Sequence, residues 1–123
     1  MKKTVNTMQE AQDMQRDIFN RDFADGPFGG VVQHLSYDKR VNTSLQYLKD
    51  DDAVLSFGCG DGTVTRRIAE HVKHVHAIDI SDNAVKTAKK YNAATNIDYR
   101  VSTIEDFKSE ISFNAVTLFE VIE

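Results

Sequence analysis

The chain has 123 residues, of which 41% are hydrophobic and 28% are charged. This length and composition are typical of one globular domain and exclude a disordered or fibrous protein. The net charge of −4 disfavours an electrostatic grip on a nucleic-acid backbone by this segment, while a nucleic acid held by other residues stays open. The single cysteine, Cys59, excludes an intrachain disulfide and suits a reducing cytoplasm.

The N-terminal segment starts with basic residues but continues with Gln, Glu and Asp instead of an apolar run. We therefore expect no signal peptide, and no stretch of the sequence is long enough to span a bilayer. These features predict a cytoplasmic protein without a membrane partner.

The first part of the chain predicts two helices separated by a break. Apolar residues at intervals of three and four predict a helix over residues 7–23. Residues 25–30 contain the only proline and three of the six glycines, which should end this helix. A second helix is expected to begin near Ser36 as its N-cap. Its apolar face is predicted to consist of Val41, Leu45 and Leu48.

From residue 53 onward, short apolar strands alternate with helices of about ten residues. Strands are predicted at residues 53–57, 75–78, 97–101 and 115–119. Helices are predicted at residues 63–72 and after Ser81, the latter with an inner face of Ala84, Val85, Ala88 and Tyr91. This alternation implies right-handed βαβ crossovers and therefore an α/β fold with a parallel sheet.

A glycine-rich loop follows the first of these strands. Gly58, Gly60 and Gly62 stand at alternate positions directly before a predicted helix. Without side chains, they allow the backbone to turn sharply and a ligand to lie against the peptide groups. The free N–H groups that open the helix favour a polar or anionic end of such a ligand. Between them, Cys59 is interpreted as a small residue in a tight turn rather than as a nucleophile.

An acidic residue at the end of the second strand makes this loop more specific. Asp79 follows Gly62 by 17 residues, and the ends of adjacent strands lie side by side in a doubly wound sheet. A carboxylate there can accept hydrogen bonds from both hydroxyls of a ribose. The alternative role, a cap for the next helix, is already filled by Ser81.

These motifs resemble those of the class I S-adenosylmethionine-dependent methyltransferases. The resemblance rests on residues 54–62, 75–80 and 113–123, and it extends over residues 36–123. It implies a Rossmann-like, doubly wound parallel sheet, which this chain can build only in part, with the strand order 3-2-1-4. The S-adenosylmethionine-binding domain would then occupy residues 36–123, incomplete at its C-terminus, after an N-terminal helical lid segment over residues 1–35.

The resemblance also implies a cofactor site for S-adenosylmethionine. The glycine loop would flank the methionine and ribose parts, Asp79 would hold the ribose, and Ile80 would pack on the adenine. The predicted cofactor-binding residues are Gly58, Cys59, Gly60, Gly62, Asp79, Ile80, Thr103, Ile104 and Phe119. Thr103 and Ile104 would hold the adenine edge, and Phe119 would lie near the methionine. Ser56 and Thr103 replace acidic side chains that are common in the family.

The resemblance predicts methyl transfer to an oxygen or nitrogen atom of a small molecule, and no catalytic residue is assigned. Three alternatives stay open. Glu120 and Glu123 have the spacing of a metal-binding motif in small-RNA 2′-O-methyltransferases. A nicotinamide-dependent oxidoreductase would share the sheet, but its G-x-G-x-x-G loop requires glycine at Thr63. A non-catalytic binding module would explain Ser56, Thr103 and the early end of the sequence.

Two further expectations concern metals and partners. His74 and His76 would share one face of a strand, but no third ligand stands beside them, so no metal site is expected. The fourth strand would be an apolar edge, with Val116, Leu118 and Phe119 uncovered. We therefore expect either a fragment of a longer protein or a homodimer that pairs through this edge.

Overall fold

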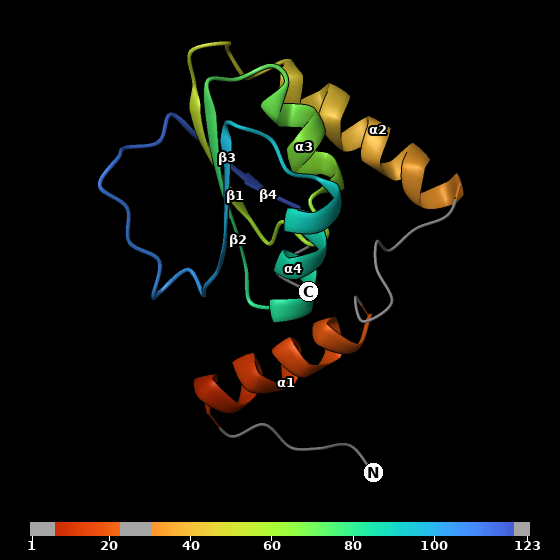
Figure 1. Ribbon diagram of the computed structural model, residues 1–123, viewed down its shortest axis with the longest axis vertical. Helices are drawn as coiled ribbons and strands as arrows, with labels where there is room; N and C mark the ends of the chain where they lie inside the picture. Colours follow the sequence, from red (N-terminus) through yellow and green to blue (C-terminus); the bar gives the residue numbers. More distant parts are fainter. Residues whose placement is uncertain (1–6, 23–30, 120–123) are drawn as a thin grey trace.

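The computed structural model describes residues 7–22 and 31–119, which form a parallel sheet with helices (Figure 1). The strands are β1 (Ala53–Phe57), β2 (His74–Asp79), β3 (Ile97–Val101) and β4 (Ala115–Leu118). The helices are α1 (Met8–Asp22), α2 (Val31–Leu45), α3 (Thr63–Ala69) and α4 (Asp82–Tyr91). The sheet has the order β3-β2-β1-β4, which confirms the predicted strand order.

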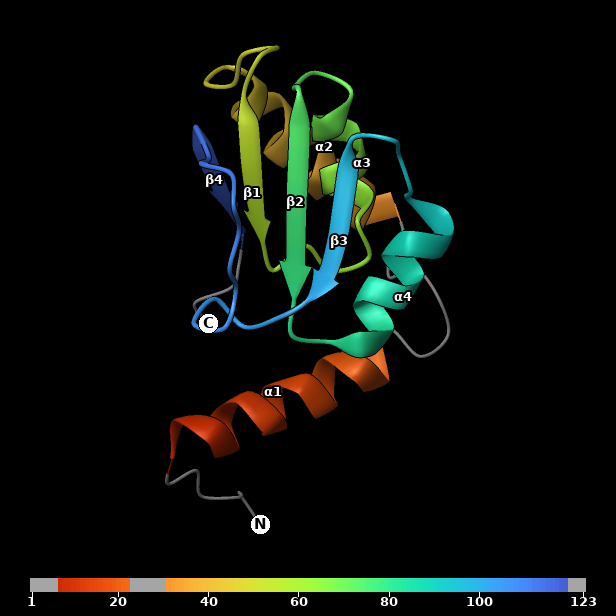
Figure 2. The same cartoon turned by 60° about the vertical axis from the view of Figure 1, so that its left-hand side comes forward.

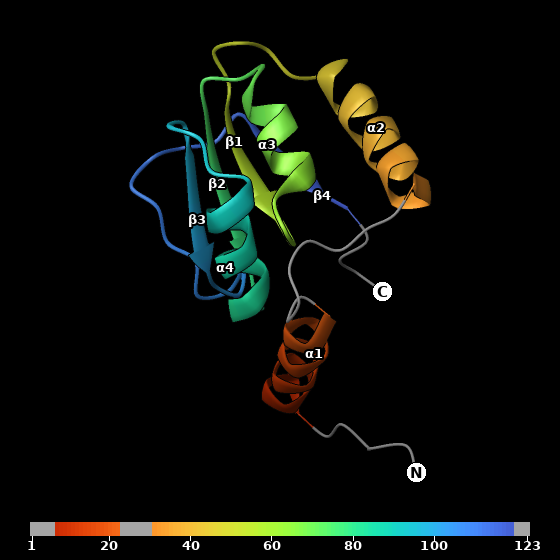
Figure 3. The ribbon, with the colours of Figure 1, turned by 45° about the vertical axis from the view of Figure 1, so that its right-hand side comes forward.

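The core lies between the sheet and the helices α3 and α4. Val54 pairs in register with Val75 and points to the same face as Ala77, which pairs with Tyr99. All four are buried, together with Ile68 from α3. Burying one such aliphatic side chain contributes about 1.5–3 kcal/mol. The crossover from β1 to β2 contains α3, and the crossover from β2 to β3 contains α4. Both crossovers are right-handed and move the chain toward the same edge of the sheet, so α3 and α4 cover the same face (Figure 3).

The connection from β3 to β4 carries the chain back past β1 on the opposite side of the sheet. Residues 102–114 form this connection and contain no helix or strand (Figure 1). The strand order therefore reverses between β1 and β4. In open α/β sheets, ligands bind at the carboxyl ends of strands where the order reverses. The topology thus points to the ends of β1, β2 and β4 as the place for a site.

The boundaries of two helices differ from the predictions. The N-cap prediction at Ser36 is wrong, because α2 begins at Val31. The pair Gly29-Gly30 directly precedes this residue, and no helix breaker lies between Val31 and Ser36. Helix α2 therefore also crosses the predicted segment boundary at residue 35.

Helix α3 ends at Ala69 rather than at residue 72. Val72 is nevertheless buried and joins the core from the following turn, which explains why the apolar spacing continued past the helix end. Tyr91 is also not on the inner face of α4, as 54% of it is exposed. It is the last residue of α4, and Lys90 lies over its ring. The N-cap prediction at Ser81 is confirmed, because its hydroxyl accepts a hydrogen bond from the Ala84 N–H.

Strand β4 lies at the edge of the sheet and ends at Leu118, one residue earlier than predicted. Val116 is 61% exposed and Leu118 is 42% exposed, as predicted for an apolar edge. The prediction is wrong for Phe119, which is partly buried because it packs against the core. Within residues 7–22 and 31–119, no helix combines the length and the apolar character needed to cross a membrane.

Gly62 is required by packing at the start of α3. Its φ of +82° lies in the left-handed region that side chains disfavour. An added Cβ would lie 2.6 Å from the Tyr99 Oη and 3.0 Å from the Ala88 Cβ. The Tyr99 hydroxyl is fixed in place because it donates a hydrogen bond of 2.8 Å to the Asn92 carbonyl. The loop therefore approaches α4 and β3 too closely for any side chain.

We expect Gly62→Ala to lower the free energy of unfolding by about 2–4 kcal/mol, from backbone strain and overpacking. Urea unfolding followed by circular dichroism measures this loss. Tyr99→Phe alone should cost about 1 kcal/mol, because one hydrogen bond is removed. The double variant should lose less than the sum, since the clashing oxygen is gone. Strict additivity of the two losses would show that the contact with Tyr99 is not the cause.

His76 is a buried histidine on the other face of the sheet. It pairs in register with Leu55 and Asp98, and its ring meets the rings of Phe107 and Phe113 from the β3–β4 connection. Its Nδ1 has no hydrogen-bond partner within the described part of the chain. This arrangement disfavours a charged imidazole.

Burial and the neighbouring His74 lower the pKa of His76 below 6.5, with Asp98 opposing and Arg100 adding to the shift. The unfolded chain therefore binds the proton more tightly than the folded chain. The free energy of unfolding should fall as the pH drops below 6.5.

We expect His76→Phe to make this loss shallower, because the ring is kept and the ionisable group is removed. Urea unfolding at several pH values between 7.5 and 5 measures the slope. His71→Gln is the matched control, since His71 is exposed, and it should retain the slope of the natural chain. Equal slopes in all three proteins would contradict the assignment to His76.

Candidate functional site

The glycine loop folds back across the end of β2. Gly58, Gly60 and Gly62 all have positive φ angles, of 71°, 57° and 82°. The N–H groups of Gly58 and Cys59 both donate to the Ile78 carbonyl, at 2.8 and 3.0 Å. These bonds hold the loop against the neighbouring strand and leave its outer side open to a ligand.

Asp79 ties this loop to the end of β2. Its Oδ2 accepts a hydrogen bond of 2.9 Å from the Gly60 N–H, and its Oδ1 accepts one of 2.9 Å from the Ser81 N–H. Only 8% of Asp79 is exposed. Burial raises the pKa of the carboxyl above 3.8, although the N–H groups of Ser81, Gly60 and Ile80 oppose this shift. The predicted meeting of Asp79 with the glycine loop is thus present.

A cavity of about 740 Å³ opens at the carboxyl ends of β1, β2 and β4. Eight of the nine predicted cofactor-binding residues line it. These are Gly58, Cys59, Gly60, Asp79, Ile80, Thr103, Ile104 and Phe119. Gly62 is not among the lining residues, because it faces Tyr99 and α4. The structure therefore brings the predicted site together except for the third glycine.

Cys59 faces the cavity from the loop. Burial raises the pKa of its thiol well above the ordinary value, and the Asp79 carboxylate adds to the shift. The thiolate is the nucleophilic form of cysteine, so this thiol is a poor nucleophile. The geometry supports the interpretation of Cys59 as a small residue in a tight turn.

Neutral hydroxyls stand at the two positions, Ser56 and Thr103, where the resemblance implied acidic side chains. The Ser56 and Thr65 hydroxyls lie 3.2 Å apart in a buried hydrogen bond beneath the glycine loop. The Thr103 hydroxyl accepts a hydrogen bond of 3.1 Å from the Asp106 N–H and so stabilises its own turn. Both Ser56 and Thr103 line the cavity, but neither brings a charge to it.

Two helices contribute lining residues that the sequence analysis did not identify. Tyr37 and Arg40 come from α2, and the Arg40 guanidinium carbon lies 5.7 Å from the Tyr37 ring and 5.9 Å from the Phe119 ring. Among the cavity-lining residues that the structure describes, Arg40 is the only cation. The only sequence feature that could have identified this pair is the spacing of three residues between the aromatic Tyr37 and the cationic Arg40 on one helix.

Helix α1 adds Met8, Gln12 and Gln15 to the cavity wall. Their spacing of four and three residues puts them on one side of the helix. Because two of these three residues are polar, the spacing of apolar residues in the sequence could not predict that this side of α1 faces the cavity. Helix α1 lies across the carboxyl ends of the strands (Figure 2).

No group of three or more metal-ligating side chains occurs within residues 7–22 and 31–119. The rings of His74 and His76 lie 4.6 Å apart. Glu120 and Glu123, on which the metal-binding alternative rests, lie outside the described residues.

The sequence matches known proteins over the same region. Residues 54–123 match the family described as a methyltransferase domain. A ubiquinone biosynthesis O-methyltransferase from Xanthomonas campestris is 38% identical over 74 residues, which are 57% of this chain and 31% of that protein. Another ubiquinone biosynthesis O-methyltransferase, from Xylella fastidiosa, is 35% identical over 74 residues, which are 30% of that protein. The chain thus spans about a third of the length of these curated relatives.

Solved structures show the same fold. The N-methyltransferase NodS from Bradyrhizobium japonicum WM9, in complex with S-adenosylhomocysteine, matches with a TM-score of 0.70 and 21% identity over 82% of this chain and 54% of that one. Phosphoethanolamine N-methyltransferase 1 from Haemonchus contortus matches with a TM-score of 0.74 and 19% identity over 90% of this chain and 26% of that one. Since the family match covers more than half of the chain and the sheet has the predicted order, the chain belongs to the methyltransferase domain family and has its class I fold.

Proposed function

We propose that the cavity binds S-adenosylmethionine and that the chain forms the cofactor-binding part of an enzyme that transfers its methyl group. The contact between Asp79 and the glycine loop carries this proposal. A buried carboxylate with a raised pKa is costly to keep charged, and such groups gather at functional sites. Asp79 lines the cavity, where it can accept hydrogen bonds from the two hydroxyls of a ribose.

The remaining lining residues support an order of contacts along the cofactor. Ile80, Thr103 and Ile104 lie on the side of Asp79 and would hold the adenine. Phe119, at the end of β4, and Arg40 would lie at the methionine end, with Gly58 between the two ends. A guanidinium at this end can pair with the carboxylate of the methionine part.

This arrangement suits methyl transfer because a sulfonium already carries a good leaving group. The protein must mainly place the acceptor atom in line behind the methyl group and keep water away. In the proposed complex the strand ends and the helices α1 and α2 would lie on either side of the cofactor. A base is needed only for an acceptor that loses a proton during attack, and we assign no such residue.

We propose an oxygen atom of a small molecule as the methyl acceptor, because the curated relatives over 74 residues are O-methyltransferases of ubiquinone biosynthesis. The net charge of −4 disfavours a nucleic-acid substrate. The single thiol supports a cytoplasmic location. The exposed edge of β4 still permits pairing with a second copy or with further chain.

We expect Asp79→Ala to weaken the binding of S-adenosylhomocysteine at least about tenfold, because charge-assisted hydrogen bonds contribute roughly 1.5–3 kcal/mol each. Isothermal titration calorimetry measures the affinity. Asp82→Ala is the matched control, since Asp82 is an exposed aspartate in the first turn of α4, and it should bind normally. Normal binding by Asp79→Ala would place the ribose elsewhere. An unaltered chain that fails to bind at millimolar ligand would contradict the proposed function.

The same affinity should depend on pH. The ionised carboxylate accepts hydrogen bonds on both oxygens and more strongly than the protonated acid does. The raised pKa of Asp79 means that this charge is lost at a higher pH than in an ordinary aspartate. The affinity should therefore be constant near neutral pH and fall on acidification. Asp79→Asn should bind weakly with no such pH dependence. A pH profile shared by both proteins would assign the titration to another group.

We expect Arg40→Met to weaken the binding of S-adenosylhomocysteine about tenfold or more while leaving methylthioadenosine unaffected. Methylthioadenosine lacks the amino-acid part, and methionine keeps the apolar stem beside Tyr37. Competition titrations with both ligands measure the difference. Equal losses for the two ligands would show that Arg40 supports the site through packing and not through the carboxylate.

A further inference from the structure

Helix α1 forms one wall of the cavity, and none of its described side chains belongs to the hydrophobic core. Met8, Gln12 and Gln15 line the cavity, and α1 contacts α4 beside it (Figure 2). Within residues 7–18, where side chains are described, none is buried, and Met8 is 71% exposed. Most helices in proteins are stabilised by tertiary packing of an apolar face. A helix without that packing depends on a few polar contacts to stay in place.

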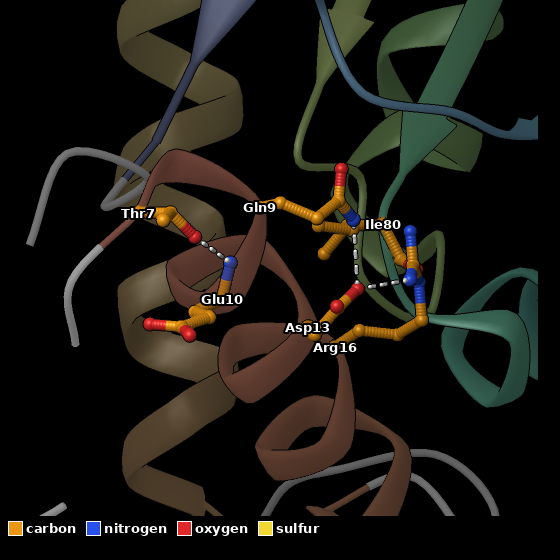
Figure 4. Close-up of polar contacts among 6 residues, drawn as sticks. All are labelled: Thr7, Gln9, Glu10, Asp13, Arg16 and Ile80. Carbon is orange, nitrogen blue, oxygen red and sulfur yellow. Dashed lines mark hydrogen bonds and ion pairs between the residues drawn. The ribbon is translucent and has the colours of Figure 1, made fainter. Parts of the chain in front are cut away.

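The main polar contact between α1 and the sheet comes from Arg16. Its Nε donates a hydrogen bond of 3.1 Å to the carbonyl of Ile80, the residue directly after Asp79 (Figure 4). The residues are 64 positions apart in sequence, so this bond joins two separate parts of the fold. It is partly buried, which protects it from competition by water.

Asp13 holds the Arg16 guanidinium in the orientation that this bond requires. The Asp13 Oδ1 accepts a hydrogen bond of 3.0 Å from the Arg16 Nη1 and one of 3.0 Å from the Gln9 Nε2 (Figure 4). The planar guanidinium can thus face Asp13 with one nitrogen and Ile80 with another. This local pair leaves the Nε directed at the strand end.

One further contact joins α1 to the loop after β3, and another caps the start of the helix. The Gln12 Nε2 donates a hydrogen bond of 3.4 Å to the Oε2 of Glu105, which lies in the loop after β3. The Thr7 hydroxyl accepts a hydrogen bond of 3.1 Å from the Glu10 N–H and so caps the start of the helix (Figure 4). Both Glu105 and Ile80 lie at the side of the cavity assigned above to the adenine.

We propose that Arg16 is a positioning residue that fastens α1 over the nucleoside end of the cavity, so that this contact must break before the cofactor enters or leaves. The proposal rests on the proposed function of the cavity. Arg16 does not line the cavity and acts through the Ile80 carbonyl. It should therefore control the rates of binding more than the affinity, because the same contact would open and close again whether or not the cavity is occupied.

The test compares Arg16→Ala with the unaltered chain in stopped-flow binding of S-adenosylhomocysteine. The association and dissociation rate constants should both rise about threefold to tenfold, the usual effect of one partly buried, charge-assisted hydrogen bond. The dissociation constant should change by less than about twofold. Arg66→Ala is the matched control, because Arg66 pairs with Glu70 on α3 and does not line the cavity. Its rates should equal those of the unaltered chain.

A rise in the dissociation rate alone would overturn the proposal, because it would show that Arg16 only strengthens the bound state. Unchanged rates would overturn it as well. A second measurement needs no ligand: hydrogen exchange of the α1 amides should be faster in Arg16→Ala than in Arg66→Ala. If the unaltered chain binds no S-adenosylhomocysteine, the proposed function fails, while this exchange difference still decides whether Arg16 fastens α1.

Discussion

The hydrogen bond between the Gly60 N–H and the Asp79 carboxylate is the contact on which the site depends. It joins the loop after β1 to the end of β2, two segments that the sheet places side by side. The Ile78 carbonyl strengthens this junction by accepting hydrogen bonds from two further loop N–H groups. These hydrogen bonds fix the backbone at the floor of the cavity, and a fixed site loses less entropy when it binds a ligand.

This arrangement has a cost in stability. Burial raises the pKa of Asp79, so the folded chain binds the proton more tightly than the unfolded chain, and the charged form destabilises the fold above that pKa. A neutral residue would avoid this cost. The proposed contact with a ribose would offset this cost, since a charged group accepts hydrogen bonds more strongly than a neutral one.

The rest of the site differs from the common family pattern in its charges. Ser56 and Thr103 are neutral, and their hydroxyls are used in contacts within the protein. Arg40 from α2 brings the positive charge, and α1 closes the wall through polar groups. The helices before the sheet thus contribute to the cavity wall as well as the strand ends.

Much of the fold could be predicted because the signals are local. Apolar runs separated by helical spacing identified all four strands, while their order was predicted from the family resemblance. Of the three glycines that precede the acid Asp79, two line the cavity together with it. A left-handed backbone and a strand end are properties of a few neighbouring residues, so they can be recognised from composition and spacing.

Other features were decided only by contacts between distant segments. Gly62 was assigned to the ligand, yet it faces Tyr99, because the approach of β3 and α4 to the loop is a property of packing. Tyr37 and Arg40 face the cavity through the position of α2, and Arg16 meets Ile80 across 64 residues. Polar side chains on an exposed helix carry no pattern that states which way they face. Their roles follow from where the sheet places the helix, and sequence spacing does not encode that placement.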